Sequence, residues 1–200
     1  MAGSRRETEI KFRLDDLASV KRDLKKLGFS VARRRVLEIN TVFDTPDSIL
    51  LRARKLLRVR QAGSGRTITF KGPPSASRYK SREEIESGLT DDKAMRLIFE
   101  RLGYKPVFRY EKYRTEYAGP DKAGLVMLDE TPMGDFLELE GPPRWIERTA
   151  RALGRSRAEF ITASYGALYR EHCQAHGAKP GDMVFRRKSA SDKTEERLRS

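Results

Sequence analysis

The chain has 200 residues, of which 38% are hydrophobic and 36% are charged, and its formal net charge at pH 7 is +13. This size suffices for one domain with a core of its own, and the charge indicates an anionic partner, such as a polyphosphate, a nucleic acid or an acidic membrane surface. Cys173 is the only cysteine, which excludes a disulfide framework and a cysteine-based zinc site. We expect a cytoplasmic protein that does not cross a membrane, because no stretch approaches the roughly 18 to 20 apolar residues of a span.

The first predicted element is a strand at residues 5–13. Successive side chains of a strand point to opposite faces, so Glu7, Glu9 and Lys11 share one face while apolar residues such as Ile10 occupy the other. Two carboxylates and an ammonium on one face suit a hard divalent cation and the phosphate that it carries. A strand with a solvated charged face would show the same pattern.

Two further Glu-x-Glu pairs repeat this plan, at Glu84/Glu86 and at Glu138/Glu140. The strand that carries each pair is followed by a helical pattern, and each of the three patterns ends at a Leu-Gly pair, namely Leu27-Gly28, Leu102-Gly103 and Leu153-Gly154. The repeat is too short and irregular for a solenoid. It indicates a symmetric sheet whose acidic strand faces converge.

Alternating and helical hydrophobic patterns divide the rest of the chain. The alternation predicts strands at residues 29–44, 56–60, 67–71, 79–86, 107–117, 125–130 and 136–140. Helical spacing and caps predict helices at residues 17–27, at 90–102 with Thr90 as the cap, at 143–153, and from a capping box at 156–159 to about 176. We therefore predict an α+β domain at residues 1–177 and a basic tail at 178–200, which is disordered from Ser189 onward and packs back onto the domain at residues 183–185.

Most of the predicted strands place charged side chains on one face and apolar side chains on the other. The basic side chains of these faces are Arg58, Arg60, Lys71, Lys80, Arg82, Lys112 and Arg114. The acidic ones are Glu7, Glu9, Glu84, Glu86, Asp129, Glu138 and Glu140. In a sandwich these faces would lie in water, whereas in a closed antiparallel barrel with its apolar faces outward, beneath the helices, they would line the interior.

A closed barrel with so many interior charges needs a ligand. Each unpaired buried ion costs several kcal/mol against a total stability of roughly 5 to 15 kcal/mol, so a dry interior of this kind would not fold. The basic side chains suit a long anion with several charges, and a barrel of about eight strands has room for one small ligand. The carboxylates suit Mg²⁺ or Mn²⁺, which prefer oxygen ligands and bridge to phosphates. We therefore expect a triphosphate-bearing small molecule as the partner.

The order of these motifs is similar to that of a known family. The motifs are Glu7-x-Glu9-x-Lys11, Phe43-Asp44-Thr45, Leu57-Arg58-Val59-Arg60, Thr69-Phe70-Lys71, Lys80-x-Arg82-x-Glu84, Lys112-x-Arg114, Asp129 and the stretch from Gly134 to Glu140. Together, over residues 4 to 176, they resemble the CYTH domain of the triphosphate tunnel metalloenzymes. This resemblance implies an eight-stranded antiparallel barrel, or tunnel, with peripheral helices. The family includes class IV adenylyl cyclases, thiamine triphosphatases and inorganic triphosphatases.

The resemblance also implies a role for each of these side chains. Divalent metal would be bound by Glu7, Glu9, Glu138 and Glu140, with Asp129 and Glu84 as further contributors. The triphosphate would be held by Arg58, Arg60, Lys71, Lys80, Arg82, Lys112 and Arg114. As catalytic residues we expect Lys11, near the reacting phosphorus, and Lys71. One departure is Val42, because thiamine triphosphatases of the family commonly have a tyrosine there to pair with the lysine, and this counts against thiamine triphosphate as the substrate.

Three functions stay open at this point. We favour a metal-dependent phosphohydrolase, since nothing in the sequence identifies an adenine pocket, and the first alternative is a class IV adenylyl cyclase that makes cyclic AMP and pyrophosphate from ATP. The second alternative is a non-enzymatic binder of polyphosphate, nucleotides or nucleic acid. We do not expect nucleic acid as the partner, because acids on the same strand faces would repel it in the absence of metal. A homodimer is left open.

Overall fold

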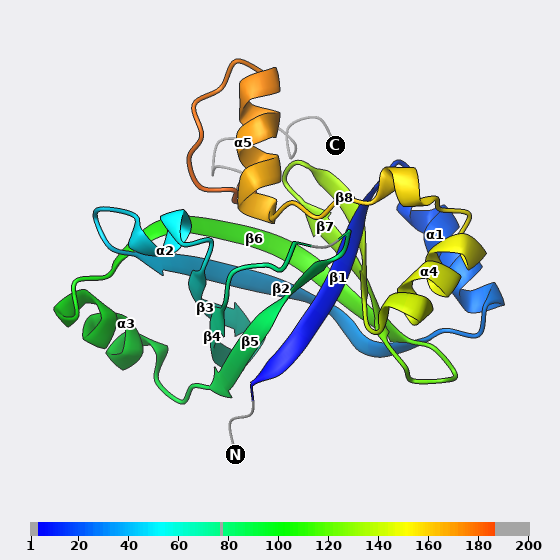
Figure 1. Ribbon diagram of the computed structural model, residues 1–200, viewed down its shortest axis with the longest axis horizontal. Coiled ribbons are helices and arrows are strands. Elements are labelled where there is room, and N and C mark those ends of the chain that lie inside the picture. The colour runs from blue at the N-terminus through cyan, green and yellow to red at the C-terminus, as the bar shows by residue number, and fades with distance from the viewer. Residues whose placement is uncertain (1–3, 77, 187–200) are drawn as a thin grey trace, which may run out of the picture.

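The computed structural model describes residues 4–76 and 78–186 of the chain. The strands in this range are β1 (Arg5–Leu14), β2 (Ser30–Asp44), β3 (Leu56–Ala62), β4 (Gly65–Lys71), β5 (Lys80–Gly88), β6 (Lys105–Ala118), β7 (Leu125–Thr131) and β8 (Gly134–Glu140). They are antiparallel and form one closed barrel in the order β1-β5-β4-β3-β2-β6-β7-β8 (Figure 1). The predicted eight-stranded barrel is therefore confirmed, and β1, with its Glu-x-Glu pair, lies between the two other strands that carry such a pair, β5 and β8.

Helices cover the outside of the barrel and one of its ends (Figure 1). They are α1 (Leu17–Lys26), α2 (Ile49–Arg52), α3 (Asp92–Arg101), α4 (Pro143–Ala152), the 3₁₀ turn η1 (Arg157–Glu159) and α5 (Tyr165–Ala175). The predicted Leu-Gly pairs end α1, α3 and α4, where Gly28, Gly103 and Gly154 have φ angles of 79°, 86° and 70°. This left-handed conformation costs glycine little, which is why helices so often end at that residue.

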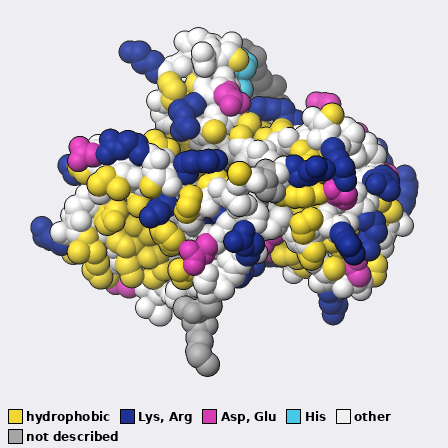
Figure 2. Space-filling model, in the orientation of Figure 1, with side chains coloured by type: hydrophobic (Ala, Val, Ile, Leu, Met, Phe, Trp, Pro, Cys, Tyr) yellow, Lys and Arg dark blue, Asp and Glu magenta, His cyan; other side chains and the backbone are white. Residues whose placement is uncertain are grey.

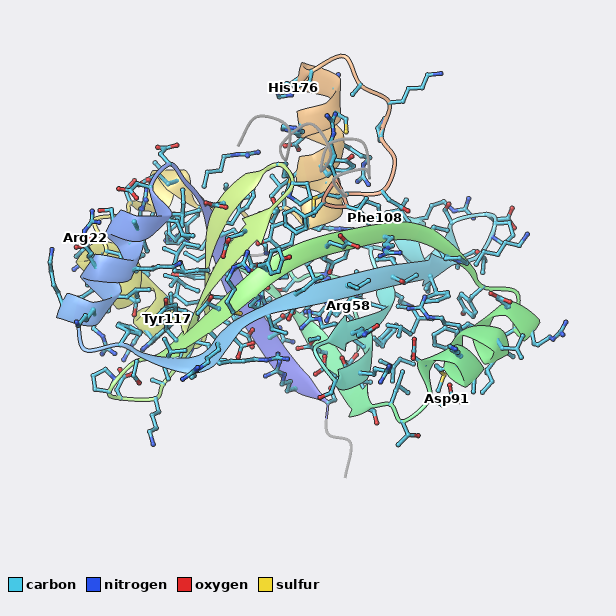
Figure 3. The ribbon with its side chains drawn as sticks, turned by 180° about the vertical axis from the view of Figure 1, so that it is seen from behind. Arg22, Arg58, Asp91, Phe108, Tyr117 and His176 are labelled. Atoms are coloured by element: carbon cyan, nitrogen blue, oxygen red, sulfur yellow. The ribbon has the colours of Figure 1, made fainter. Side chains whose placement is uncertain are left out.

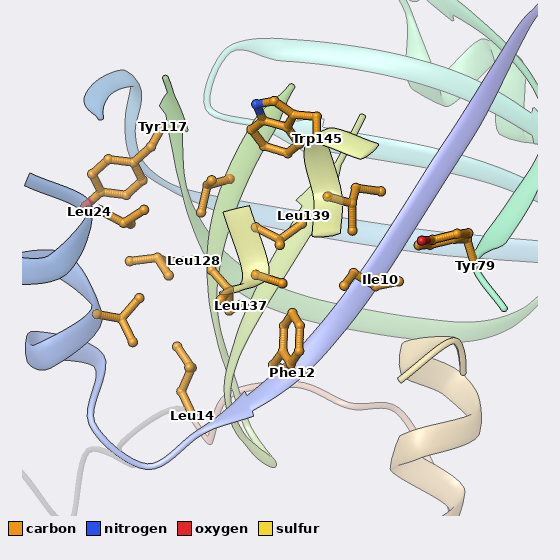
Figure 4. Packing of buried hydrophobic residues seen from close by; sticks show 14 residues of the cluster. Ile10, Phe12, Leu14, Leu24, Tyr79, Tyr117, Leu128, Leu137, Leu139 and Trp145 are labelled. Carbon is orange, nitrogen blue, oxygen red and sulfur yellow. The ribbon is translucent and has the colours of Figure 1, made fainter. Parts of the chain in front are cut away.

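The apolar core lies outside the barrel, between the strands and the helices. Beneath α1 and α4, Ile10 of β1 and Leu139 of β8 pack with Trp145 and other fully buried side chains (Figure 4). A second cluster joins Phe43 of β2 to Phe99 of α3, whose ring centroids are 5.1 Å apart. Because side chains alternate along a strand, the outward position of the apolar side chains turns the charged ones into the barrel.

One predicted helix was wrong in its N-terminal part. The capping box forms, because the carboxylate of Glu159 accepts hydrogen bonds from the N–H and the hydroxyl of Ser156 at 2.7 and 3.0 Å, but it encloses only the turn η1. The chain then extends, and the backbones of Lys11 and Ile161 exchange two hydrogen bonds of 3.0 Å. Pairing with β5 ends at Glu9, so this contact satisfies backbone groups of β1 that would otherwise lack a partner. The helix α5 begins only afterwards.

Two local details also differ from the sequence prediction. The cap of α3 is Asp91 rather than Thr90, since the Asp91 carboxylate accepts hydrogen bonds from two backbone N–H groups of the first turn at 2.9 Å. The short helix α2 was not predicted. It is held by the buried carboxylate of Asp44, which accepts backbone N–H groups of Leu50 and Leu51 at 2.9 Å and thereby fixes the segment that follows β2.

The chain after α5 returns to the barrel. Met183 is fully buried, its N–H donates to the carbonyl of Arg109 at 2.9 Å, and its carbonyl accepts from the N–H of Glu111 at 2.8 Å. These groups belong to a part of β6 that extends past its pairing with β7, so the returning segment completes that strand's hydrogen bonds. The predicted disorder from Ser189 onward falls outside the described residues. No helix within the described ranges has the length and apolarity needed to span a membrane.

Candidate active site

A cavity of about 750 Å³ occupies the barrel and opens toward α2 and α5. Most side chains predicted to form the site line this one cavity, namely Glu7, Glu9, Lys11, Arg58, Arg60, Lys71, Lys80, Arg82, Lys112, Arg114, Glu138 and Glu140. Three further acids of the predicted inner faces, Glu84, Glu86 and Asp129, do not line the cavity but pair with residues that do. In Figure 3, Arg58 lies among the strands of the barrel, whereas Phe108 lies on β6 near α5.

Lysines and glutamates alternate along the side of the cavity formed by β1, β4 and β5. Nζ of Lys71 lies 2.5 Å from Oε1 of Glu7, and Nζ of Lys80 lies 2.7 Å from Oε1 of Glu9. Lys11 donates to the same Glu9 oxygen at 2.9 Å. Burial lowers the pKa of Lys80 to about 8, against the opposing effect of Glu9. These lysines are therefore held in place by carboxylates before any phosphate binds.

Asp129 of β7 organises the opposite wall. Its carboxylate accepts hydrogen bonds from Nζ of Lys112 at 2.8 Å, from Nε and Nη2 of Arg114 at 2.7 and 2.6 Å, and from the hydroxyl of Tyr165 at 2.6 Å. Burial opposes ionisation of Asp129, but the charges of Arg114 and Lys112 outweigh it and hold the pKa well below its usual range. Four donors already bond to this carboxylate, three at Oδ2 and one at Oδ1, so a metal bound by Asp129 would compete with them for its charge.

Glu38 and Asn40 of β2 were not predicted. The fully buried carboxylate of Glu38 lies 3.3 Å from Nη1 of Arg60 and 3.7 Å from Nζ of Lys112, and Asn40 accepts a hydrogen bond from Nε of Arg60 at 3.0 Å. Burial alone would raise the pKa of Glu38, but Arg60 and Lys112 lower it to about 2. Alternation from Val42, which lines the cavity, back along β2 places Asn40 and Glu38 on the inner face. The irregular first half of the strand obscures this signal in the sequence.

Arg58 is held by neutral hydroxyl groups. It donates to the hydroxyl of Tyr110 at 3.2 Å and to that of Thr69 at 3.1 Å. Burial raises the pKa of Tyr110, but the positive charges of Arg58 and its neighbours outweigh this and lower it to about 8. Val42 also lines the cavity. A tyrosine hydroxyl therefore enters the cavity from β6, next to the strand on which the family resemblance suggested one.

Residues 5–165 match the family model of the CYTH domain. The chain belongs to the CYTH family. A relative from Methanocaldococcus jannaschii named "Putative adenylate cyclase" is 37% identical over 134 residues, which are 67% of this chain and 75% of the relative. A solved structure from Pyrococcus horikoshii OT3 is 25% identical, with a TM-score of 0.71, over 82% of this chain and 98% of that one. A solved structure from Hippeastrum, described as a putative adenylyl cyclase with a dominant triphosphatase activity, is 18% identical, with a TM-score of 0.61, over 87% of this chain and 98% of that one. At this identity the likeness supports the shared fold alone.

The family implies a divalent metal, and the carboxylates of this CYTH chain have suitable chemistry for one. Within the described ranges no three His, Cys, Asp or Glu side chains stand close enough to form a ready site, because the acids are paired with lysines and arginines. Glu140 differs from the other acids of the cavity, because no buried cation of the described chain forms an ion pair with it. Burial and the nearby Glu7 raise its pKa to about 7, and its cationic partner Arg5 is 3.4 Å away and mostly exposed. A hard cation beside Glu140 and its cross-strand neighbour Glu9 would relieve this repulsion.

Proposed function

We propose that this CYTH protein is a divalent-metal-dependent phosphohydrolase that acts on a triphosphate-bearing substrate within the barrel. The observation that carries the proposal is the cavity of about 750 Å³, whose wall combines basic side chains of β3, β4, β5 and β6 with carboxylates of β1 and β8. An anion of several charges suits the basic part of this wall. The carboxylate part would repel such an anion unless a cation lay between them.

Substrate binding in this proposal is an exchange of partners. Every predicted phosphate-binding cation forms an ion pair with a carboxylate, at distances from 2.5 to 3.9 Å. A triphosphate would replace these carboxylates as the partner of the cations. Guanidinium and ammonium groups form short, charge-assisted hydrogen bonds with phosphate oxygens, and such bonds are stronger in an enclosed site than in water.

The carboxylates released by this exchange would hold the metal together with Glu140, which pairs with Arg5 instead. Glu7, Glu9, Glu138 and Glu140 are the candidate ligands, and Mg²⁺ or Mn²⁺, when bound, would neutralise phosphate charge and favour ionisation of a water. Lys11 and Lys71 would donate to oxygens of the transferring phosphoryl group and stabilise the charge that develops there. The remaining cations would hold the triphosphate in line with the attacking water, a positioning that supplies much of the rate acceleration in phosphoryl transfer.

The second candidate is an adenylyl cyclase reaction in the same cavity. It is favoured by the name of the relative that is 37% identical. In that reaction the ribose 3′-hydroxyl of ATP would attack the α-phosphorus, forming cyclic AMP and releasing pyrophosphate. The same cations would then stabilise the leaving pyrophosphate. A non-enzymatic polyphosphate or nucleotide binder would use the same cations without the reaction.

Product analysis tests these functions directly. The purified protein is incubated with tripolyphosphate, ATP and thiamine triphosphate, each with Mg²⁺, with Mn²⁺ or with EDTA. We expect orthophosphate in the presence of metal and none with EDTA. Cyclic AMP and pyrophosphate from ATP would establish the cyclase instead, and the absence of any product would leave binding as the function.

A further inference from the structure

A second cavity lies outside the barrel, where α4 ends and the turn η1 begins. This outer pocket has a volume of about 500 Å³, and its charged lining residues are Glu147, Arg151, Arg155 and Arg157. Figure 2 shows Lys and Arg side chains gathered over the region of α1 and α4, on the right of the molecule. Three guanidinium groups against one carboxylate give the lining of the outer pocket an excess of positive charge.

The end of α4 brings these arginines together. Gly154 has a φ angle of 70°, in the left-handed region, and its N–H donates to the carbonyl of Arg151 at 3.0 Å. The N–H of Arg155 donates to the carbonyl of Ala150 at 2.9 Å. This is the pattern of a helix that ends in a left-handed glycine, after which the chain turns away from the helix axis. Arg151, in the last turn of α4, and Arg155 and Arg157, beyond it, therefore line one pocket.

The carboxylates that pair with two of these arginines have other hydrogen-bond donors. Nη2 of Arg157 lies 2.5 Å from Oε2 of Glu147, whose other oxygen accepts a hydrogen bond from the hydroxyl of Tyr79. Nη1 of Arg155 lies 3.2 Å from Oε1 of Glu159, which also accepts the two hydrogen bonds of the capping box. Each carboxylate would remain hydrogen-bonded if its arginine turned toward a ligand, which lowers the cost of such an exchange.

Arg151 is the third arginine of the pocket. Its side chain is exposed, and within residues 4–76 and 78–186 it forms no ion pair. The outer pocket thus combines one guanidinium without a carboxylate partner and two that can change partners. Guanidinium groups bind phosphate oxygens through parallel, charge-assisted hydrogen bonds, so this arrangement suits a phosphate group.

The outer pocket is larger than an inorganic phosphate ion. The four oxygens of orthophosphate, at a water's share of about 30 Å³ each, fill about 120 Å³, compared with about 500 Å³ in the pocket. Ala150 and Phe160 complete the lining with apolar surface. The pocket therefore also has room for an organic group attached to the phosphate.

We infer that the outer pocket binds a phosphate group through Arg151, Arg155 and Arg157. The site lies outside the barrel and does not depend on the reaction proposed above, so a failure of that reaction would leave it standing. The shared chemistry is a terminal phosphate with two sources: inorganic phosphate, and a phosphate monoester such as a nucleoside monophosphate.

Calorimetric titration of the whole chain with orthophosphate and with AMP, in the presence of EDTA, tests the site. Both probes can also enter the barrel, so variants assign the two classes of binding. Arg151→Ala should weaken the outer class by about 5- to 10-fold and leave the barrel class unchanged, whereas Arg58→Ala should weaken the barrel class alone. Tighter binding of AMP to the outer class identifies the monoester as the source, and equal or weaker binding identifies the inorganic ion. Binding that Arg151→Ala leaves unchanged for both probes overturns the site.

Arg144→Ala is the matched control. Arg144 is an exposed arginine of the same helix and does not line the outer pocket, so its replacement removes the same charge from the same surface. Equal losses in Arg144→Ala and Arg151→Ala would show general attraction of anions and overturn the site.

Glu147→Gln provides a change in the opposite direction. It removes the charge that competes for Arg157 and keeps an oxygen that accepts from Tyr79. The probe should bind the outer class about 2- to 5-fold more tightly, as for the loss of an exposed ion pair. Glu171→Gln, at an exposed position of α5, should leave this affinity unchanged. Equal affinity in Glu147→Gln and the parent would show that Arg157 does not turn to the ligand and would overturn the exchange of partners on which the site depends.

Discussion

Oε1 of Glu38 lies 3.3 Å from Nη1 of Arg60, inside the barrel and out of contact with solvent. Neither oxygen of this carboxylate accepts a hydrogen bond from a described residue, so the charges of Arg60 and, at 3.7 Å, of Lys112 are what stabilise it. Both cations are predicted to bind phosphate. Glu38 therefore keeps two mutually repelling cations together in the absence of substrate.

Replacement of Glu38 by glutamine should destabilise the protein most at neutral pH. The folded state lowers the pKa of Glu38 from its ordinary 4.5 to about 2, so its contribution is fully present above pH 4.5 and is lost as the pH falls through 2. The shift corresponds to about 3 kcal/mol, and removing one partner of a buried ion pair costs a similar amount. Urea unfolding should show Glu38→Gln less stable than the parent by about this amount at pH 7 and by clearly less at pH 3.

Glu130→Gln is the matched control for that measurement. Glu130 forms a bidentate pair with Arg35 on the outer face of the barrel, at 2.8 and 2.9 Å, where both side chains reach solvent. An exposed pair contributes less than about 1 kcal/mol, so the variant should unfold almost like the parent. A difference between Glu38→Gln and the parent that stayed constant from pH 7 to pH 3 would contradict the assigned charge of Glu38.

Glu9→Gln tests the predicted metal ligands. The substitution keeps the shape of the side chain and removes a charge that faces Lys11 and Lys80 within the cavity. Metal-dependent turnover should fall at least about 100-fold, because a ligand of the ion that stabilises several kcal/mol of charge is lost, while circular dichroism shows a folded barrel. Glu100→Gln, on the exposed face of α3, should retain full activity. Equal turnover in the parent and Glu9→Gln would remove Glu9 from the site.

Strand alternation accounts for how much of this site was predictable. Once a strand is recognised, its inner face follows from the period of two, and the charged set of β1, β3, β4, β5, β6 and β8 was identified in that way. Glu38 and Asn40 escaped because β2 begins with the run Arg33 to Arg35, where the register shifts relative to β6. These irregularities hide which face of the strand points inward.

The C-terminal part of the chain depends on contacts that a local pattern does not show. The stretch from 156 to 176 has helical spacing, yet pairing of Ile161 with Lys11 interrupts it, because the backbone of β1 needs a partner there. This interruption places Tyr165 at the start of α5, where its hydroxyl reaches Asp129. Tertiary hydrogen bonds outweighed helical propensity at this point.

Gly124→Ala tests the packing that supports the end of β8. A Cβ atom at this position would lie 2.5 Å from Cε3 of Trp145 and 2.6 Å from the carbonyl oxygen of Glu140. Trp145 is buried and the second neighbour is backbone, so the clash forces the two elements apart. We expect a loss of about 1 to 3 kcal/mol in the free energy of unfolding. Gly88→Ala is the control, because no atom lies within 4 Å of its Cβ, and an equal loss there would contradict the packing argument.

Metal and triphosphate should bind cooperatively, because each frees groups that the other needs. Glu7 holds Lys71 at 2.5 Å, so a metal on Glu7 releases an ammonium for phosphate, and a phosphate on Lys71 releases a carboxylate for metal. The coupling is reciprocal and is expected to lie in the usual range of about 5- to 150-fold in affinity. Calorimetric titration with a methylene-bridged triphosphate analogue, with and without Mg²⁺, measures this coupling. The complex that the metal and the analogue form in solution is titrated separately and subtracted.

Glu7→Gln should bind the analogue without metal at least as well as the parent, since Lys71 loses its competing anion, but should lose most of the gain in affinity caused by Mg²⁺. A gain that is the same in Glu7→Gln and the parent would mean that the metal acts on the triphosphate alone and that the exchange of partners at Lys71 does not occur.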